Sequence, residues 1–177
     1  MKKIGIFICL TVVFLIIYLI QVNFFSWFNL AGVMPNLFVI FVLTIGLFSG
    51  KRMGVTFGII FGVAIDFFIG KSIGISGIML GIVGFLGGYL DKRFSKDSRV
   101  TMIITVFMVT VIYEIGIYGF NYLINSVEIN IIYYIKTLLT EIIYNIILTI
   151  IFYPTIMKYG YKLEDNFREN KILTRYF

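Results

Sequence analysis

Long apolar runs with almost no charge constrain the fold of this sequence more than any other feature. The chain is 60% hydrophobic and 14% charged, whereas a soluble domain has about 45–50% apolar and about 25% charged residues. A helix needs about 20 apolar residues to cross the hydrocarbon core of a bilayer. The alternating strands of a membrane barrel do not give runs this continuous. The sequence therefore predicts an all-α, polytopic membrane protein.

Six runs are expected to cross the membrane. They cover residues 4–22, 33–49, 54–69, 73–90, 100–124 and 132–157. The second and third runs are close to the minimum length of a span, and a re-entrant pair is the alternative for them. The first run is longer than the apolar part of a signal peptide, about 7–15 residues, and no small-residue cleavage site follows it. We therefore expect an uncleaved first span, a single membrane domain over residues 1–177, and a cytoplasmic tail at residues 158–177.

Lysine and arginine predict the orientation of these spans. With the N-terminus in the cytoplasm, all but two of the 15 Lys and Arg residues fall on the cytoplasmic side, as the positive-inside rule requires. The exceptions are Lys71 and Lys136. Lys51 and Arg52 lie between the second and third runs and would fall outside if these runs were re-entrant, which argues against that alternative. Both termini are predicted to be cytoplasmic.

The residue types exclude several kinds of site. The chain has no His and one Cys, Cys9, which excludes a disulfide within one copy and metal sites built on His or Cys. The net charge of +6 comes from basic residues between apolar runs, so it indicates topology control rather than nucleic-acid binding. No nucleophile–base arrangement or phosphate-binding loop is present. We expect neither enzyme activity nor a cofactor.

The glycines follow an unusual spacing. They recur every fourth residue from Gly46 to Gly62, and at gaps of four and three from Gly70 to Gly88. Such gaps keep residues on one helix face, and small residues let helix backbones approach closely in a bilayer. Before Gly54 the spacing crosses a loop, where turn chemistry is an alternative explanation. The glycines expected to pack helices are Gly58, Gly62, Gly74, Gly77, Gly81, Gly84 and Gly88.

Three carboxylates fall inside the expected spans. Asp66 follows Gly62 on the glycine face, Glu114 lies in a polar stripe, and Glu141 lies in another stripe together with Asn145. A charge at the bilayer centre costs at least about 2.5–3.5 kcal/mol, so such residues usually face the protein interior and find partners. Three roles remain open for these carboxylates: structural hydrogen bonding, a proton or ion pathway, or contact with a partner's transmembrane helix.

Several short motifs occur in a recognisable order along the chain. They are Met-Pro-Asn-Leu at 34–37, the glycine-basic segment 46–52, the segment 58–66 that ends at Asp66, the segment 84–90 with its following basic loop, and Tyr113-Glu114. In this order the motifs resemble the bacterial rod shape-determining MreD family. The family also fits the whole chain in length and in the number of spans.

The resemblance implies a function and partners. It implies a non-enzymatic scaffold in the bacterial cytoplasmic membrane, within the elongation machinery that builds lateral peptidoglycan. Family members associate with the single-span protein MreC, and through it with MreB, RodA and a class B penicillin-binding protein. We expect the glycine faces and Asp66 to shape a surface or cavity that engages the transmembrane helix of MreC.

The resemblance also supplies an alternative function. The family's fold is similar to the six-helix substrate-binding subunits of energy-coupling-factor transporters, so the alternative is a vitamin-binding transport subunit. Those subunits commonly dock through Ala-rich motifs in their first span. Residues 4–22 contain no Ala and only Gly5 as a small residue, which argues against transport. A proton-coupled channel or transporter is a third class, resting on Asp66, Glu114 and Glu141.

Overall fold

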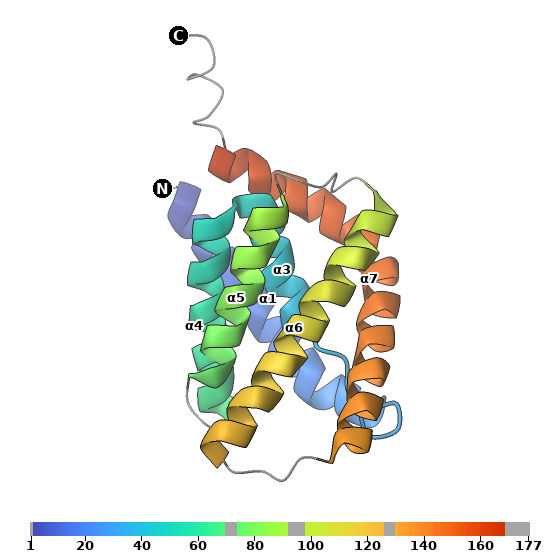
Figure 1. The fold of residues 1–177 in the computed structure, drawn as a ribbon. Helices are drawn as coiled ribbons and strands as arrows, with labels where there is room; N and C mark the ends of the chain where they lie inside the picture. The colour runs from blue at the N-terminus through green and yellow to red at the C-terminus, as the bar shows by residue number, and fades with distance from the viewer. Residues whose placement is uncertain (1, 70–73, 92–97, 126–129, 169–177) are drawn as a thin grey trace.

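The computed structural model describes residues 2–69, 74–91, 98–125 and 130–168, and every regular element in these ranges is a helix (Figure 1). The all-α prediction is therefore confirmed for the described residues. Gly70, Lys71, the expected span start at residue 73 and the tail residues 169–177 lie outside them. The elements are α1 (Lys2–Leu19), η1 (Ile20–Phe24), α2 (Phe25–Trp27), α3 (Leu37–Ser49), α4 (Lys51–Ile69), α5 (Ile75–Leu90), α6 (Arg99–Asn125) and α7 (Ile131–Arg168).

The helices fall into two groups by length. Four helical stretches are long and apolar enough to cross a membrane: Ile4–Trp27, Lys51–Ile69, Arg99–Ile124 and Ile131–Phe167. The apolar helices α3 and α5 have 13 and 16 residues, or about 20 and 24 Å at 1.5 Å per residue. Length and composition thus give a membrane protein with four of the six expected crossings.

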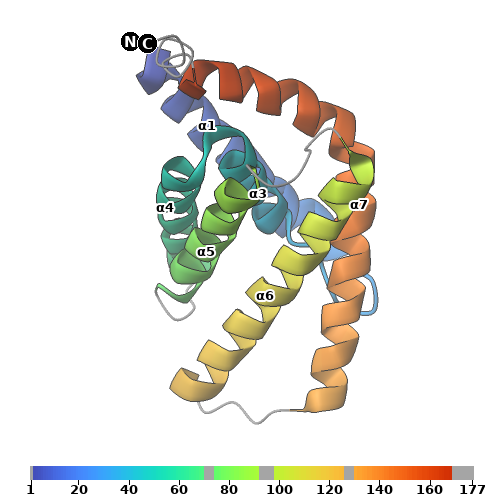
Figure 2. The ribbon, with the colours of Figure 1, turned by 45° about the horizontal axis from the view of Figure 1, so that its top comes forward.

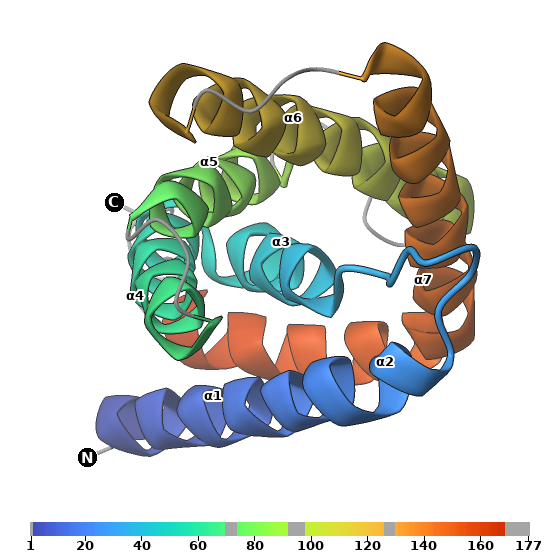
Figure 3. The same cartoon turned by 90° about the horizontal axis from the view of Figure 1, so that it is seen from below.

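Helix α3 lies at the centre of the molecule. Seen from below, α1, α4, α5, α6 and α7 surround it (Figure 3). Val39, Val42, Leu43 and Phe48 of α3 are fully buried, as expected for a helix that is apolar on all sides. In contrast, α1 exposes most of its apolar side chains, Ile8 among them, which suits a helix that faces lipid.

Two helix starts differ from the sequence prediction. The second run begins as a helix at Leu37 rather than at residue 33, because Pro35 disfavours helical backbone before it. The side chain of Asn36 then caps α3 by accepting a hydrogen bond from the Val39 N–H at 3.3 Å. Helix α4 begins at Lys51 rather than at residue 54, because the connection from α3 is the single residue Gly50 at φ +86°, a conformation that glycine adopts readily.

The last helix is longer than predicted. Residues 158–168, expected to belong to a cytoplasmic tail, continue α7. Pro154 lies inside α7, and the red part of this helix turns across one end of the molecule (Figure 2). A proline in a helix removes one hydrogen bond and causes a kink rather than an obligatory end. Beyond the kink, Tyr161 contacts the ring of Phe48 edge-on at 5.4 Å, so the helix is held against the end of α3.

Candidate functional site

A glycine seam joins α4 and α5. At Gly58 a Cβ atom would overlap the Leu80 carbonyl and lie 2.9 Å from the Gly81 Cα. At Gly62 a Cβ atom would lie 2.5 Å from the Gly77 Cα. The two backbones are therefore in direct contact, as small-residue interfaces in membranes allow.

Gly84 is the point at which three helices meet. A Cβ atom on Gly84 would overlap the carbonyl of Gly54 on α4, and a Cβ atom on Gly46 of α3 would overlap the carbonyl of Gly84 itself. Near the same end, a Cβ atom on Gly88 would lie 2.5 Å from the Lys51 Cα. In all, seven glycines have a backbone atom of another helix or of the connection from α3 to α4 less than 3.0 Å from an added Cβ atom. We call them the glycine core, and its members are Gly46, Gly54, Gly58, Gly62, Gly84, Gly87 and Gly88.

The remaining three predicted packing glycines are placed differently. Gly74 has φ +101° and nothing within 4 Å of an added Cβ, so it serves the backbone turn before α5. A Cβ atom on Gly77 would meet the Val63 Cγ2 at 2.8 Å, and one on Gly81 would meet the Ile59 Cγ1 at 3.0 Å. Side-chain atoms are thus the nearest obstacles at both positions, and backbone atoms of α4 lie farther away, from 3.4 Å at Gly77 and at 4.0 Å at Gly81.

Asp66 holds the start of α5. Its side chain is 3% exposed, and its Oδ2 atom accepts hydrogen bonds from the backbone N–H groups of Gly74 at 2.8 Å and Ser76 at 3.1 Å. The first N–H groups of a helix have no partner within the helix, and a carboxylate beside them also complements the helix dipole. The Asp66 carboxylate is thus directed into the protein, at the start of α5.

Asn145 links three helices through its side chain and is fully buried. Its Oδ1 accepts from the Asn36 backbone N–H at 2.7 Å, before α3, and its Nδ2 donates to the Thr110 Oγ1 on α6 at 3.1 Å. On α7 itself, the Thr149 hydroxyl donates to the Asn145 carbonyl at 2.7 Å. Because buried polar groups need partners, these bonds fix how α6 and α7 sit against the start of α3.

The two other carboxylates lie beside Asn145. Glu141 is 6% exposed, and its carboxyl lies within hydrogen-bonding reach of Glu114, Asn36 and Asn145. Among the described residues, no hydrogen bond is found to its buried Oε1 atom. We call Asn36, Thr110, Glu114, Glu141 and Asn145 the polar cluster.

The structure brings some predicted site residues together and separates others. Glu114, Glu141 and Asn145 meet in the polar cluster, whereas Asp66 binds the backbone at the start of α5. In the described part of the chain, no group of three or more Asp, Glu, His or Cys side chains could hold a metal ion.

Sequence reasoning missed several participants in both sites. Asn36 was read only as part of a motif, although a polar residue directly before an apolar run is a helix-cap signal. Gln21 was also missed: its side chain accepts from the Leu37 N–H at 3.2 Å and donates to the Pro35 carbonyl. The sequence did carry a signal for Gln21, because an amide side chain within an apolar run is expected to have a partner inside the protein. Gly46 and Gly54 pack on Gly84, so their spacing reflects helix packing and not turn chemistry alone.

Comparison with known families gives one match. The model of the family described as rod shape-determining protein MreD matches residues 1–163. No curated protein and no solved structure matches the chain. The expected likeness to transporter substrate-binding subunits is therefore not confirmed.

Proposed function

This chain belongs to the rod shape-determining protein MreD family, and from that premise we propose that it is a non-enzymatic scaffold of the bacterial cell-elongation complex. In this proposal it is required for lateral peptidoglycan synthesis and acts with MreC, and through MreC with MreB, RodA and a class B penicillin-binding protein. The match over 163 residues is the observation that carries the proposal.

The internal packing supports a scaffold. Direct backbone contacts in the glycine core hold α3, α4 and α5 together, and the polar cluster ties α6 and α7 to the start of α3. The buried polar side chains thus have a structural use, which a scaffold needs and which leaves the outer helix faces for lipid and partners. The glycine core and Asp66 are buried within this chain, so in this proposal they hold in place the helices whose outer faces MreC contacts.

We place the protein in the bacterial cytoplasmic membrane, as one domain with six crossings and cytoplasmic termini. The first residues of α1, the connection from α3 to α4 and the end of α7 lie at the same end of the molecule (Figure 1). Lys51 and Arg52 lie at that end, which supports the orientation through the positive-inside rule. In this proposal α3 and α5 cross the membrane although they are shorter than the roughly 30 Å hydrocarbon core.

Co-purification tests the partnership with MreC. We expect the tagged full-length protein, extracted from a rod-shaped bacterium in mild detergent, to recover MreC in an amount comparable to its own. A Gly119→Leu variant should recover the same amount, because nothing lies within 4 Å of a Cβ atom at this position. An unrelated multi-pass protein with the same tag gives the background.

Two results would count against the scaffold. Recovery of MreC at the background level would remove the proposed partner. A small molecule retained in equal amount with the protein, detected by mass spectrometry, would favour the alternative of a vitamin-binding transport subunit.

A further inference from the structure

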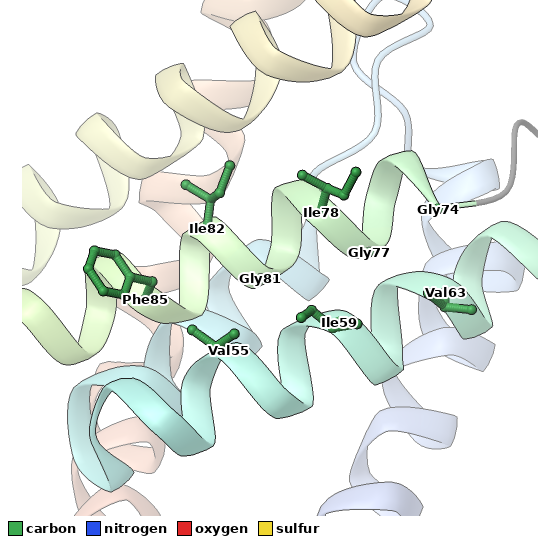
Figure 4. A pocket seen from close by; sticks show the side chains of 9 residues that line it. All are labelled: Val55, Ile59, Val63, Gly74, Gly77, Ile78, Gly81, Ile82 and Phe85. Carbon is green, nitrogen blue, oxygen red and sulfur yellow. The ribbon is translucent and has the colours of Figure 1, made fainter.

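An apolar groove runs along the outer side of the pair α4 and α5 (Figure 4). Its volume is about 510 Å³, within the range of about 300–1,000 Å³ that is usual for ligand sites. Ile59, Val63 and Phe85 are between 40% and 46% exposed along it. The residues that line it are Val55, Ile59, Val63, Gly74, Gly77, Ile78, Gly81, Ile82 and Phe85.

Gly77 and Gly81 leave the groove open. Both lie on α5 between a row of side chains from α4 and a row from α5 (Figure 4). A Cβ atom on Gly81 would meet only side-chain atoms of Ile59 at 3.0 and 3.6 Å before reaching the Val55 carbonyl at 4.0 Å. A Cβ atom at Gly81 would therefore require only a small shift of the Ile59 side chain, whereas backbone blocks a Cβ atom in the glycine core. The Cα atoms of Gly77 and Gly81 adjoin Gly62 and Gly58 in the seam, and the absence of side chains at these two positions keeps the groove open.

A cation lies at one end of the groove. The Nζ atom of Lys51 is 5.1 Å from the ring centre of Phe85, which lines the groove, and 4.5 Å from that of Tyr89. Such distances are typical of cation–π contacts. Lys51 is the first residue of α4, so its ammonium lies at the helix end, where lipid headgroups meet a membrane protein. The groove thus combines an apolar channel with a positive charge at headgroup level.

The length of the groove matches one leaflet. On α4 it extends from Val55 to Val63, about 12 Å at 1.5 Å per residue. On α5 it extends from Gly74 to Phe85, about 17 Å. Half of the hydrocarbon core is about 15 Å, so the groove accommodates an acyl chain from one leaflet, whereas a partner's spanning helix would pack along a longer seam.

From this charge complementarity and length, we infer that the groove binds an anionic phospholipid, with one acyl chain over Gly77 and Gly81 and the phosphate at Lys51. The inference does not depend on the proposed scaffold function, because it uses only the geometry of α4 and α5. Lipid bound here would cover the outer side of the glycine core.

Native mass spectrometry of the full-length protein tests this site. The delipidated protein is titrated with phosphatidylglycerol or phosphatidylethanolamine that carry the same acyl chains, and we expect phosphatidylglycerol to be retained more strongly. One lysine near an anionic headgroup contributes about fivefold in affinity. Lys51→Gln should therefore weaken retention of phosphatidylglycerol about fivefold, whereas Arg52→Gln, with the same change in charge at an exposed neighbour, should change it less than twofold. Gly81→Leu should reduce retention of both lipids.

Circular dichroism and size-exclusion chromatography establish that each variant is folded. Should Gly81→Leu not fold, Ile82→Trp fills the groove from its exposed wall and takes its place. Equal retention of the two lipids by the wild type would overturn the inference, as would equal effects of the Lys51 and Arg52 variants. Unchanged lipid retention together with loss of MreC from the groove-filling variant would assign the groove to a partner helix instead.

Discussion

Gly84→Leu is expected to prevent formation of the folded protein. A Cβ atom at this position overlaps the Gly54 carbonyl, and the Gly84 carbonyl in turn touches Gly46 on α3. Overpacking against movable side chains costs about 1–3 kcal/mol. Here the obstacle is the backbone of α4 at Gly54, so α4 and α5 have to separate. We expect no monodisperse peak in size-exclusion chromatography, and at Gly84→Ala a destabilisation of about 3 kcal/mol or more.

Gly119→Leu is the matched control for this prediction. Gly119 also lies inside a long helix, α6, but nothing lies within 4 Å of an added Cβ atom. Replacing a helical glycine gains up to about 1 kcal/mol of helix propensity at either position, so any difference between the two variants comes from packing. Equal thermal stability of the two leucine variants would contradict the packing assigned to Gly84.

Asn145→Leu is expected to lower stability by about 2 kcal/mol. The variant leaves the Asn36 N–H and the Thr110 hydroxyl without the partners that Asn145 supplies, and a buried unsatisfied group costs about 1–3 kcal/mol. Interhelical hydrogen bonds in membrane proteins average only about 0.6 kcal/mol, so the loss comes mainly from the stranded groups. Thermal unfolding in detergent measures this effect.

Asn166→Leu is the control for Asn145→Leu. The Asn166 amide donates to the Lys162 carbonyl of its own helix and joins no other element through that bond. We expect its unfolding temperature to stay close to that of the wild type. An Asn145 variant as stable as the Asn166 variant would mean that the polar cluster does not hold α6 and α7 in place.

The glycine pattern predicted close helix packing but not its partners. Periodicity gives the face of one helix, and it correctly placed Gly58 and Gly62 on one side of α4. It does not say which helix lies opposite, since that depends on the order in which helices pack. The spacing before Gly54 therefore left turn chemistry open as an alternative. In the structure Gly50 is the residue with positive φ, and Gly46 and Gly54 both pack on Gly84.

For the polar residues, too, the sequence predicts the position on one helix but not the contacts between helices. Sequence alone placed Glu114 and Glu141 in separate stripes, and only the meeting of α6 and α7 brings them together. Asp66 shares a face with Gly62, yet its partners are backbone N–H groups beyond the next turn. Hydropathy likewise ended the last span at residue 157. The contact between Tyr161 and Phe48, which keeps α7 helical across the end of α3, is tertiary and leaves no local pattern.

Cell shape after depletion is the measurement that tests the central claim most directly. In a rod-shaped bacterium that carries this gene under a repressible promoter, we predict that cells become round as the protein is depleted. A plasmid copy of the wild type or of Gly119→Leu should restore rods, and Gly84→Leu should not. Cells that stay rod-shaped after the protein has disappeared would contradict the proposed role in cell elongation.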